Sequence, residues 1–164
     1  MSEQQTYKQV RDVVVRIRDA HQRLRDALEE SRSRASDSRS RHMLESLRQE
    51  EQELQSSLAK QLKNGDSQKV LDTWLQYTPD AELFETLEQI DFRPEMSAEE
   101  VVACKQKFDE DLTALLRQLK EATATPSVEE FFGSLLEEIE TRIGQASWKL
   151  REFQGDEDPP EPAH

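Results

Sequence analysis

An all-α fold is predicted for this chain by three features of its sequence. Apolar residues recur every three or four positions over long stretches, which is the period of an amphipathic helix and not of a strand. Charged residues make up 35% of the chain, and the six prolines lie between or after the periodic stretches, where helices begin or end. Because 164 residues suffice for one domain with a sizeable core, we expect a single helical bundle over residues 1–155.

The first helix is expected over residues 7–33. Thr6 and Gln9 have the spacing of a capping box, in which side chains satisfy the free backbone amides of a helix start. The core face that follows carries Val10, Val14, Ile17, His21, Leu24 and Leu28. The helix leads into a serine-rich stretch, and we expect a tight hairpin turn near residue 35.

The second helix is expected to run antiparallel to the first and to complete a hairpin over residues 7–63. Ser36 or Asp37 can cap its start, and Asn64-Gly65 is the usual kind of left-handed C-terminal cap. The core face of this helix carries Leu44, Leu47, Glu51, Leu54, Leu58 and Leu62. One acid therefore stands where a packed core would favour a hydrocarbon side chain.

Residues 64–96 are expected to form a long crossover with apolar residues of its own. The spacing from Leu71 to Tyr77 predicts a short amphipathic helix. Thr78-Pro79 is expected to begin another helix, and Arg93-Pro94 to end it.

A second hairpin is expected over residues 97–153. Ser97 with Glu100, and Ser127 with Glu130, have the spacing of capping boxes at the starts of its two helices. The core faces carry Val101, Cys104, Phe108, Leu112, Leu115 and Leu119 in the first of these helices, and Val128, Phe132, Leu135, Ile139, Ala146 and Leu150 in the second. The acidic residues 156–164 are expected to be a disordered tail.

The two predicted hairpins have nearly equal lengths and matching core positions, which amounts to a weak internal repeat. Hairpin, crossover and hairpin, together with the string Leu44-Glu-Ser-Leu-Arg-Gln-Glu-Glu51, resemble the ferritin-like superfamily, closest to rubrerythrin-like four-helix bundles. The resemblance covers roughly residues 7–153. It implies a glutamate from the first and third helices and a Glu-x-x-His pair from the second and fourth, all directed at metal ions inside the bundle.

Carried over residue by residue, the resemblance retains a single acid of that pattern, Glu51. The other ligand positions fall on Ile17, Leu54, Phe108, Ile139 and Arg142. The resemblance therefore implies a ferritin-like bundle that has lost its dinuclear site and needs no cofactor.

We hypothesise that charges of the chain itself replace the metals, in a buried cluster of His21, Glu51 and Arg142. With a turn near residue 35, antiparallel geometry puts His21 opposite Glu51, and Arg142 would approach from the last helix. A cationic partner is expected because a buried carboxylate without one is strongly destabilising. In the alternative interpretation, Glu51 and Arg142 lie at the edge of the bundle and reach water.

A metal site remains an alternative if the helix register differs by one residue. Asp109 and Glu138 would then point inward, and with Glu51 and His21 they could hold iron or manganese. Asp111 could take the place of Asp109. The chain would in that case be a divergent di-metal oxidase.

The formal net charge of -13 argues against a nucleic-acid or anionic-membrane binder, because the field of the protein repels polyanions. Residues 8–48 nevertheless hold eleven Lys and Arg against seven Asp and Glu. Part of this excess lies at the predicted tip of the first hairpin, at Arg32, Arg34, Arg39 and Arg41. A helical adaptor or chaperone could bind an acidic partner or an anion there, although a solvated helix end would have the same composition.

Taken together, the sequence favours a non-enzymatic interaction or regulatory module. We expect it to bind a protein partner or to associate with itself as a dimer through a face of the bundle. The polar N-terminus has neither the charge pattern of a signal peptide nor an apolar run that could span a bilayer, so a cytoplasmic protein is expected.

Overall fold

The computed structural model of the chain describes residues 9–75 and 97–155. The prediction of an all-α fold is confirmed, since these residues form helices and, apart from one isolated bridge between Gln9 and Trp74, no β-structure. In chain order the elements are α1 (Val10–Arg34), α2 (Ser38–Lys63), the short 3-10 helix η2 (Gly65–Ser67), α3 (Gln68–Leu71), α5 (Ala98–Ala122) and α6 (Pro126–Gly155).

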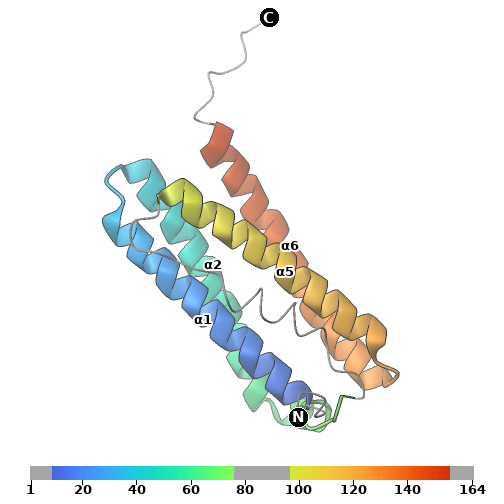
Figure 1. Cartoon of the computed structure of the whole chain (residues 1–164). Helices are drawn as coiled ribbons and strands as arrows, with labels where there is room; N and C mark the ends of the chain where they lie inside the picture. Colours follow the sequence, from blue (N-terminus) through green and yellow to red (C-terminus); the bar gives the residue numbers. More distant parts are fainter. Residues whose placement is uncertain (1–8, 76–96, 156–164) are drawn as a thin grey trace, which may run out of the picture.

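The four long helices form two antiparallel hairpins that pack side by side (Figure 1). The first hairpin consists of α1 and α2, and the second of α5 and α6. Between the hairpins, α2 lies beside α6 and α1 lies beside α5. The interior of the bundle is therefore lined by one face of each helix. The first helix that we expected in the crossover lies earlier than predicted, since α3 ends at Leu71 and the chain is not helical from there to residue 75. The second expected helix falls in residues 76–96, outside the described residues.

Two helix starts follow the predicted capping chemistry. Asp37 caps α2, since its carboxylate accepts a hydrogen bond from the Ser40 backbone amide at 3.1 Å. At the start of α5, the Ser97 hydroxyl accepts from the Glu100 amide at 3.1 Å, and the Glu100 carboxylate accepts from the Ser97 amide at 2.8 Å. The two bonds of this box satisfy two backbone donors that a helix start would otherwise leave free.

The starts of α1 and α6 differ from the prediction. α1 begins at Val10 and not at residue 7, and the backbone amide of Gln9 donates to the Asp12 carboxylate at 3.0 Å. α6 begins one residue before Ser127, at Pro126. Proline is well suited to the first helical position because its fixed backbone angle fits the helix and it has no amide hydrogen to satisfy. Ser127 consequently lies inside the first turn and not at the cap.

The predicted left-handed cap at Asn64-Gly65 is wrong. No residue of the described part has a positive φ, glycines included, and Asn64 is extended with φ of -70°. The Asn64 side chain instead accepts from the Asp66 amide at 2.8 Å and starts η2. The chain turns here through a new helical turn, so the conformational freedom of Gly65 is not used.

The core faces of the four helices lie close to their predicted positions. Leu62 is half-buried, the side chain of Leu150 lies outside what the structure describes, and the other apolar residues predicted to face the interior on α1, α2 and α6 are buried, from Val10 to Ala146. The register is less exact on α5, where Cys104 is only half-buried and its neighbour Lys105 is 3% exposed. A lysine therefore lies in the interior where the sequence pattern predicted a cysteine.

A buried charge cluster as the candidate functional site

The acid that interrupts the apolar face of α2 lies in the bundle interior and is paired there. Glu51 is 3% exposed, and its Oε1 lies 2.5 Å from Nδ1 of His21, which projects from α1 and is fully buried. Because an ionised carboxylate can only accept, Nδ1 carries the proton of this hydrogen bond. The edge of the His21 ring packs against Phe108, with ring centroids 4.9 Å apart at 71°.

The cation of the cluster is Lys105 of α5. Its ammonium group lies 3.1 Å from Oε2 of Glu51 and 2.6 Å from Oδ2 of Asp109, one helical turn further along α5. Both oxygens of Glu51 are thus engaged, one by His21 and the other by Lys105. Three helices contribute to the cluster, α1 with His21, α2 with Glu51 and α5 with Lys105 and Asp109.

Electrostatics within the cluster sets the pKa of each charged member differently. Burial alone would raise the pKa of Glu51, but the adjacent Lys105 and His21 outweigh burial and lower it to about 2. Burial opposes the charge of Lys105, whereas Glu51 and Asp109 favour it more strongly and raise its pKa above the usual value. The pKa of Asp109 is raised, because burial and the negative charge of Glu51 outweigh the attraction of Lys105.

These values indicate a structural ion pair more than an acid–base centre. A carboxylate with a pKa near 2 is a poor general base at neutral pH, and an ammonium that holds its proton so firmly is a poor acid or nucleophile. One ammonium faces two carboxylates, so Asp109 is the member whose charge is least compensated. Asp109 also borders a groove of about 500 Å³ between α5 and α6, which Arg117 and Ile143 line further along.

The predicted place of Arg142 in this cluster is wrong. The structure brings His21 and Glu51 together, but Arg142 lies at the edge of the bundle with 27% of its side chain exposed. Its guanidinium pairs with Glu53 at 3.1 Å and with Glu138 at 3.6 Å. A long arginine side chain that starts near the rim reaches water and surface acids at lower cost than a buried site.

The residues of the metal alternative are not gathered into one site. Asp109 and Glu51 face the same ammonium, whereas Glu138 lies outside with Arg142 and Asp111 pairs with the exposed Lys107 at 3.2 Å. Within the described residues, no three acid, histidine or cysteine side chains are close enough together to hold a metal ion. The position between Glu51 and Asp109 is filled by Lys105.

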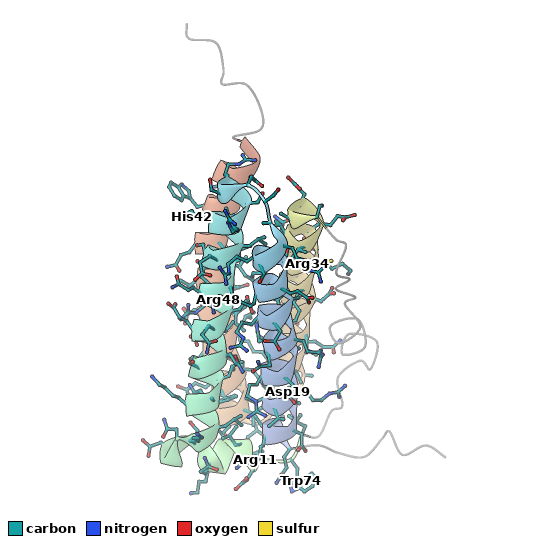
Figure 2. The ribbon with its side chains drawn as sticks, turned by 90° about the vertical axis from the view of Figure 1, so that its left-hand side faces the viewer. Arg11, Asp19, Arg34, His42, Arg48 and Trp74 are labelled. Carbon is teal, nitrogen blue, oxygen red and sulfur yellow. The ribbon has the colours of Figure 1, made fainter. Side chains whose placement is uncertain are left out.

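The arginines at the tip of the first hairpin, where Figure 2 labels Arg34, are partly neutralised by neighbouring acids. Arg32 pairs with Glu29 at 2.5 Å and with Glu45 at 3.2 Å. Arg34 pairs with Glu30 at 3.0 Å. Arg39 also has a partner in the chain, while Arg41 is exposed. The tip is therefore a mixed network of both charges and not a concentrated basic patch.

Lys105 is the site residue that the sequence analysis missed. The predicted core face of this helix passes through Cys104 and does not include the adjacent Lys105. The signal that could have found it is the spacing of Lys105 and Asp109, an i to i+4 pair of opposite charge on the flank of the apolar face. That spacing alone is common on solvated helices, so only the packing of α5 against α2 identifies this pair as buried.

Comparison with known proteins adds no assignment. The chain matched no protein-family model, no curated protein and no solved structure. Among the described helices, none has the length and apolar character needed to cross a membrane.

Proposed function

We propose that this chain is a non-enzymatic, metal-independent helical bundle of the ferritin-like type that acts as an interaction module. The observation that supports the proposal is the position of the Lys105 ammonium between Glu51 and Asp109. In a ferritin-like bundle, carboxylates that project into the interior bind metal ions, which compensate their negative charge. Here a side chain of the protein itself provides the positive charge.

A built-in ammonium changes what the interior can bind. Two buried carboxylates without a cation would be strongly destabilising, and Lys105 offsets part of that cost without any cofactor. It also opposes a metal, because a divalent ion between Glu51 and Asp109 would have to displace the ammonium or lie against it. Four of the positions where the family pattern has ligands are buried apolar residues, namely Ile17, Leu54, Phe108 and Ile139.

The experiment that tests the proposal is elemental analysis of the protein purified from cells grown aerobically with iron, manganese and zinc. We expect far less than one metal ion per chain, and the same low content in a Glu51→Gln variant. About two metal ions per chain, lost in Glu51→Gln, would contradict the proposal and favour the di-metal oxidase alternative.

The adaptor alternative, in which the first hairpin tip binds an acidic partner, has less support. Arg32 and Arg34 are engaged by glutamates of the same hairpin, and a partner would have to compete with these. We therefore propose that the interaction surface lies elsewhere on the bundle.

A further inference from the structure

The outward face of α6 carries an unusual row of residues for a solvated helix. Five exposed positions follow one another at alternating steps of four and three: Glu137, Thr141, Gly144, Trp148 and Arg151. This spacing is the heptad spacing of helices that pack along one another. The row lies opposite the core face of α6, which includes Phe132, Ile139 and Ala146.

Two members of the row have no explanation within the bundle. Trp148 is 57% exposed, although a large aromatic side chain gains most from burial. Gly144 lies in the interior of a helix, where glycine is destabilising relative to alanine, and a Cβ added to it would meet no described atom within 4 Å. Nothing in the described part of the chain therefore requires a glycine at this position.

The two charged residues of the row are placed so that they could pair with the same row on a second copy of the chain. Glu137 lies seven residues before Gly144 and Arg151 seven residues after it. No ion pair engages either side chain within the described residues. If two α6 helices pack antiparallel about a two-fold axis at Gly144, each Glu137 meets the partner subunit's Arg151, and this contact occurs twice.

We propose that the chain forms a two-fold symmetric dimer through this face of α6, with Gly144 at the crossing point. Glycine lets the two helix backbones approach closely, and Trp148 then packs over the partner subunit's Thr141 and Gly144. The last turns of α6 project beyond the start of α5, which leaves this end of the helix accessible to a second copy (Figure 1). The proposal rests on the interaction module proposed above and names its partner.

Sedimentation velocity over a concentration series tests the dimer. We expect the wild-type protein to approach twice the mass of one chain, and Trp148→Ala to remain monomeric at the same concentrations. Trp74→Ala is the matched control, because Trp74 is also exposed, at 61%, but lies at the opposite end of the bundle beside α3 (Figure 2). It should dimerise like the wild type.

Charge exchange distinguishes a two-fold pairing from any other use of the face. Glu137→Arg alone, or Arg151→Glu alone, places like charges opposite each other twice and should weaken the dimer by roughly tenfold in Kd. The double variant with both exchanges restores the opposite charges and should recover most of the affinity. Circular dichroism of each variant verifies that the bundle is folded.

A wild-type protein that stays monomeric at every concentration, or a dimer that Trp148→Ala leaves intact, would overturn the proposal. So would a double charge exchange that shows no recovery. Metal analysis of the same samples separates the two claims. A metal-free monomer would contradict only the dimer, whereas a metal-loaded dimer would contradict only the metal-independent bundle.

Discussion

At the scale of single residues, Lys105 is the cation that allows two carboxylates to be buried in the interior of the bundle. Its side chain is 4% exposed and holds Glu51 and Asp109 together across two helices. An apolar residue at the same position would leave Asp109 without a cation and Glu51 with His21 as its remaining partner. Removing one partner of a buried ion pair is among the most destabilising single changes a protein can undergo.

We therefore predict that Lys105→Met lowers the free energy of unfolding by about 3–5 kcal/mol. The matched control is Lys107→Met on the same helix, where the lysine is exposed and pairs with Asp111, and a change within about 0.5 kcal/mol is expected there. Urea unfolding at neutral pH measures both. Equal stability of the two variants would contradict a buried role for Lys105.

The lowered pKa of Glu51 predicts how the stability of the fold depends on pH. The carboxyl has a folded-state pKa of about 2 and an ordinary value of 4.5, so the folded state binds fewer protons than the unfolded state between these values. Its contribution to stability is present above pH 4.5 and is lost as the pH falls towards 2. The stability difference between wild type and Glu51→Gln should accordingly be largest at neutral pH and shrink on acidification.

Urea unfolding of both proteins at several pH values provides the test. Comparing the two proteins at each pH removes the contribution of the many surface carboxylates, which both share. Asp109 has the opposite effect on the pH dependence of stability from Glu51, because its raised pKa favours the folded state as the pH falls. A difference that stays constant between pH 7 and pH 3 would show that Glu51 is not held in its charged form.

At the scale of helices, one of the two capping boxes predicted for the second hairpin is present in the structure and the other is not. Ser97 makes the cap of α5 through its hydroxyl, whereas Ser127 lies inside the first turn of α6 after Pro126. We predict that Ser97→Ala costs about 1 kcal/mol and that Ser127→Ala changes stability by less than about 0.5 kcal/mol. Thermal unfolding of the two variants measures this, and similar losses would contradict the observed helix starts.

The helices were predictable because their signals are local. Apolar period and polar caps fix α1, α2, α5 and α6 to within a few residues, since both depend on side chains close to each other in sequence. The end of α2 was less predictable, because Asn64 can support either a left-handed turn or a new helical turn. The pairing of His21 with Glu51 followed from the position of the hairpin turn near residue 35.

At the scale of the whole molecule, the partner of Glu51 on the other hairpin could not be predicted from local signals. Arg142 and Lys105 lie on different helices of the second hairpin, and either could have faced Glu51 in a four-helix bundle. The choice depends on how the two hairpins rotate against each other. On α5 the predicted core residues Val101, Phe108 and Leu112 are buried, and the buried face also extends to Lys105 and Asp109 on its flank, where the apolar period gives no signal.

We propose that this bundle provides its own interior cation, Lys105, and needs no metal. Thermal unfolding of chelator-treated protein, with and without added iron, manganese or zinc, tests it most directly, since it also detects a metal lost during purification. We predict the same Tm in all samples, because a ligand that does not bind the folded state cannot stabilise it. A Tm that rises with metal concentration in the wild type, and no longer rises in Glu51→Gln, would contradict the claim.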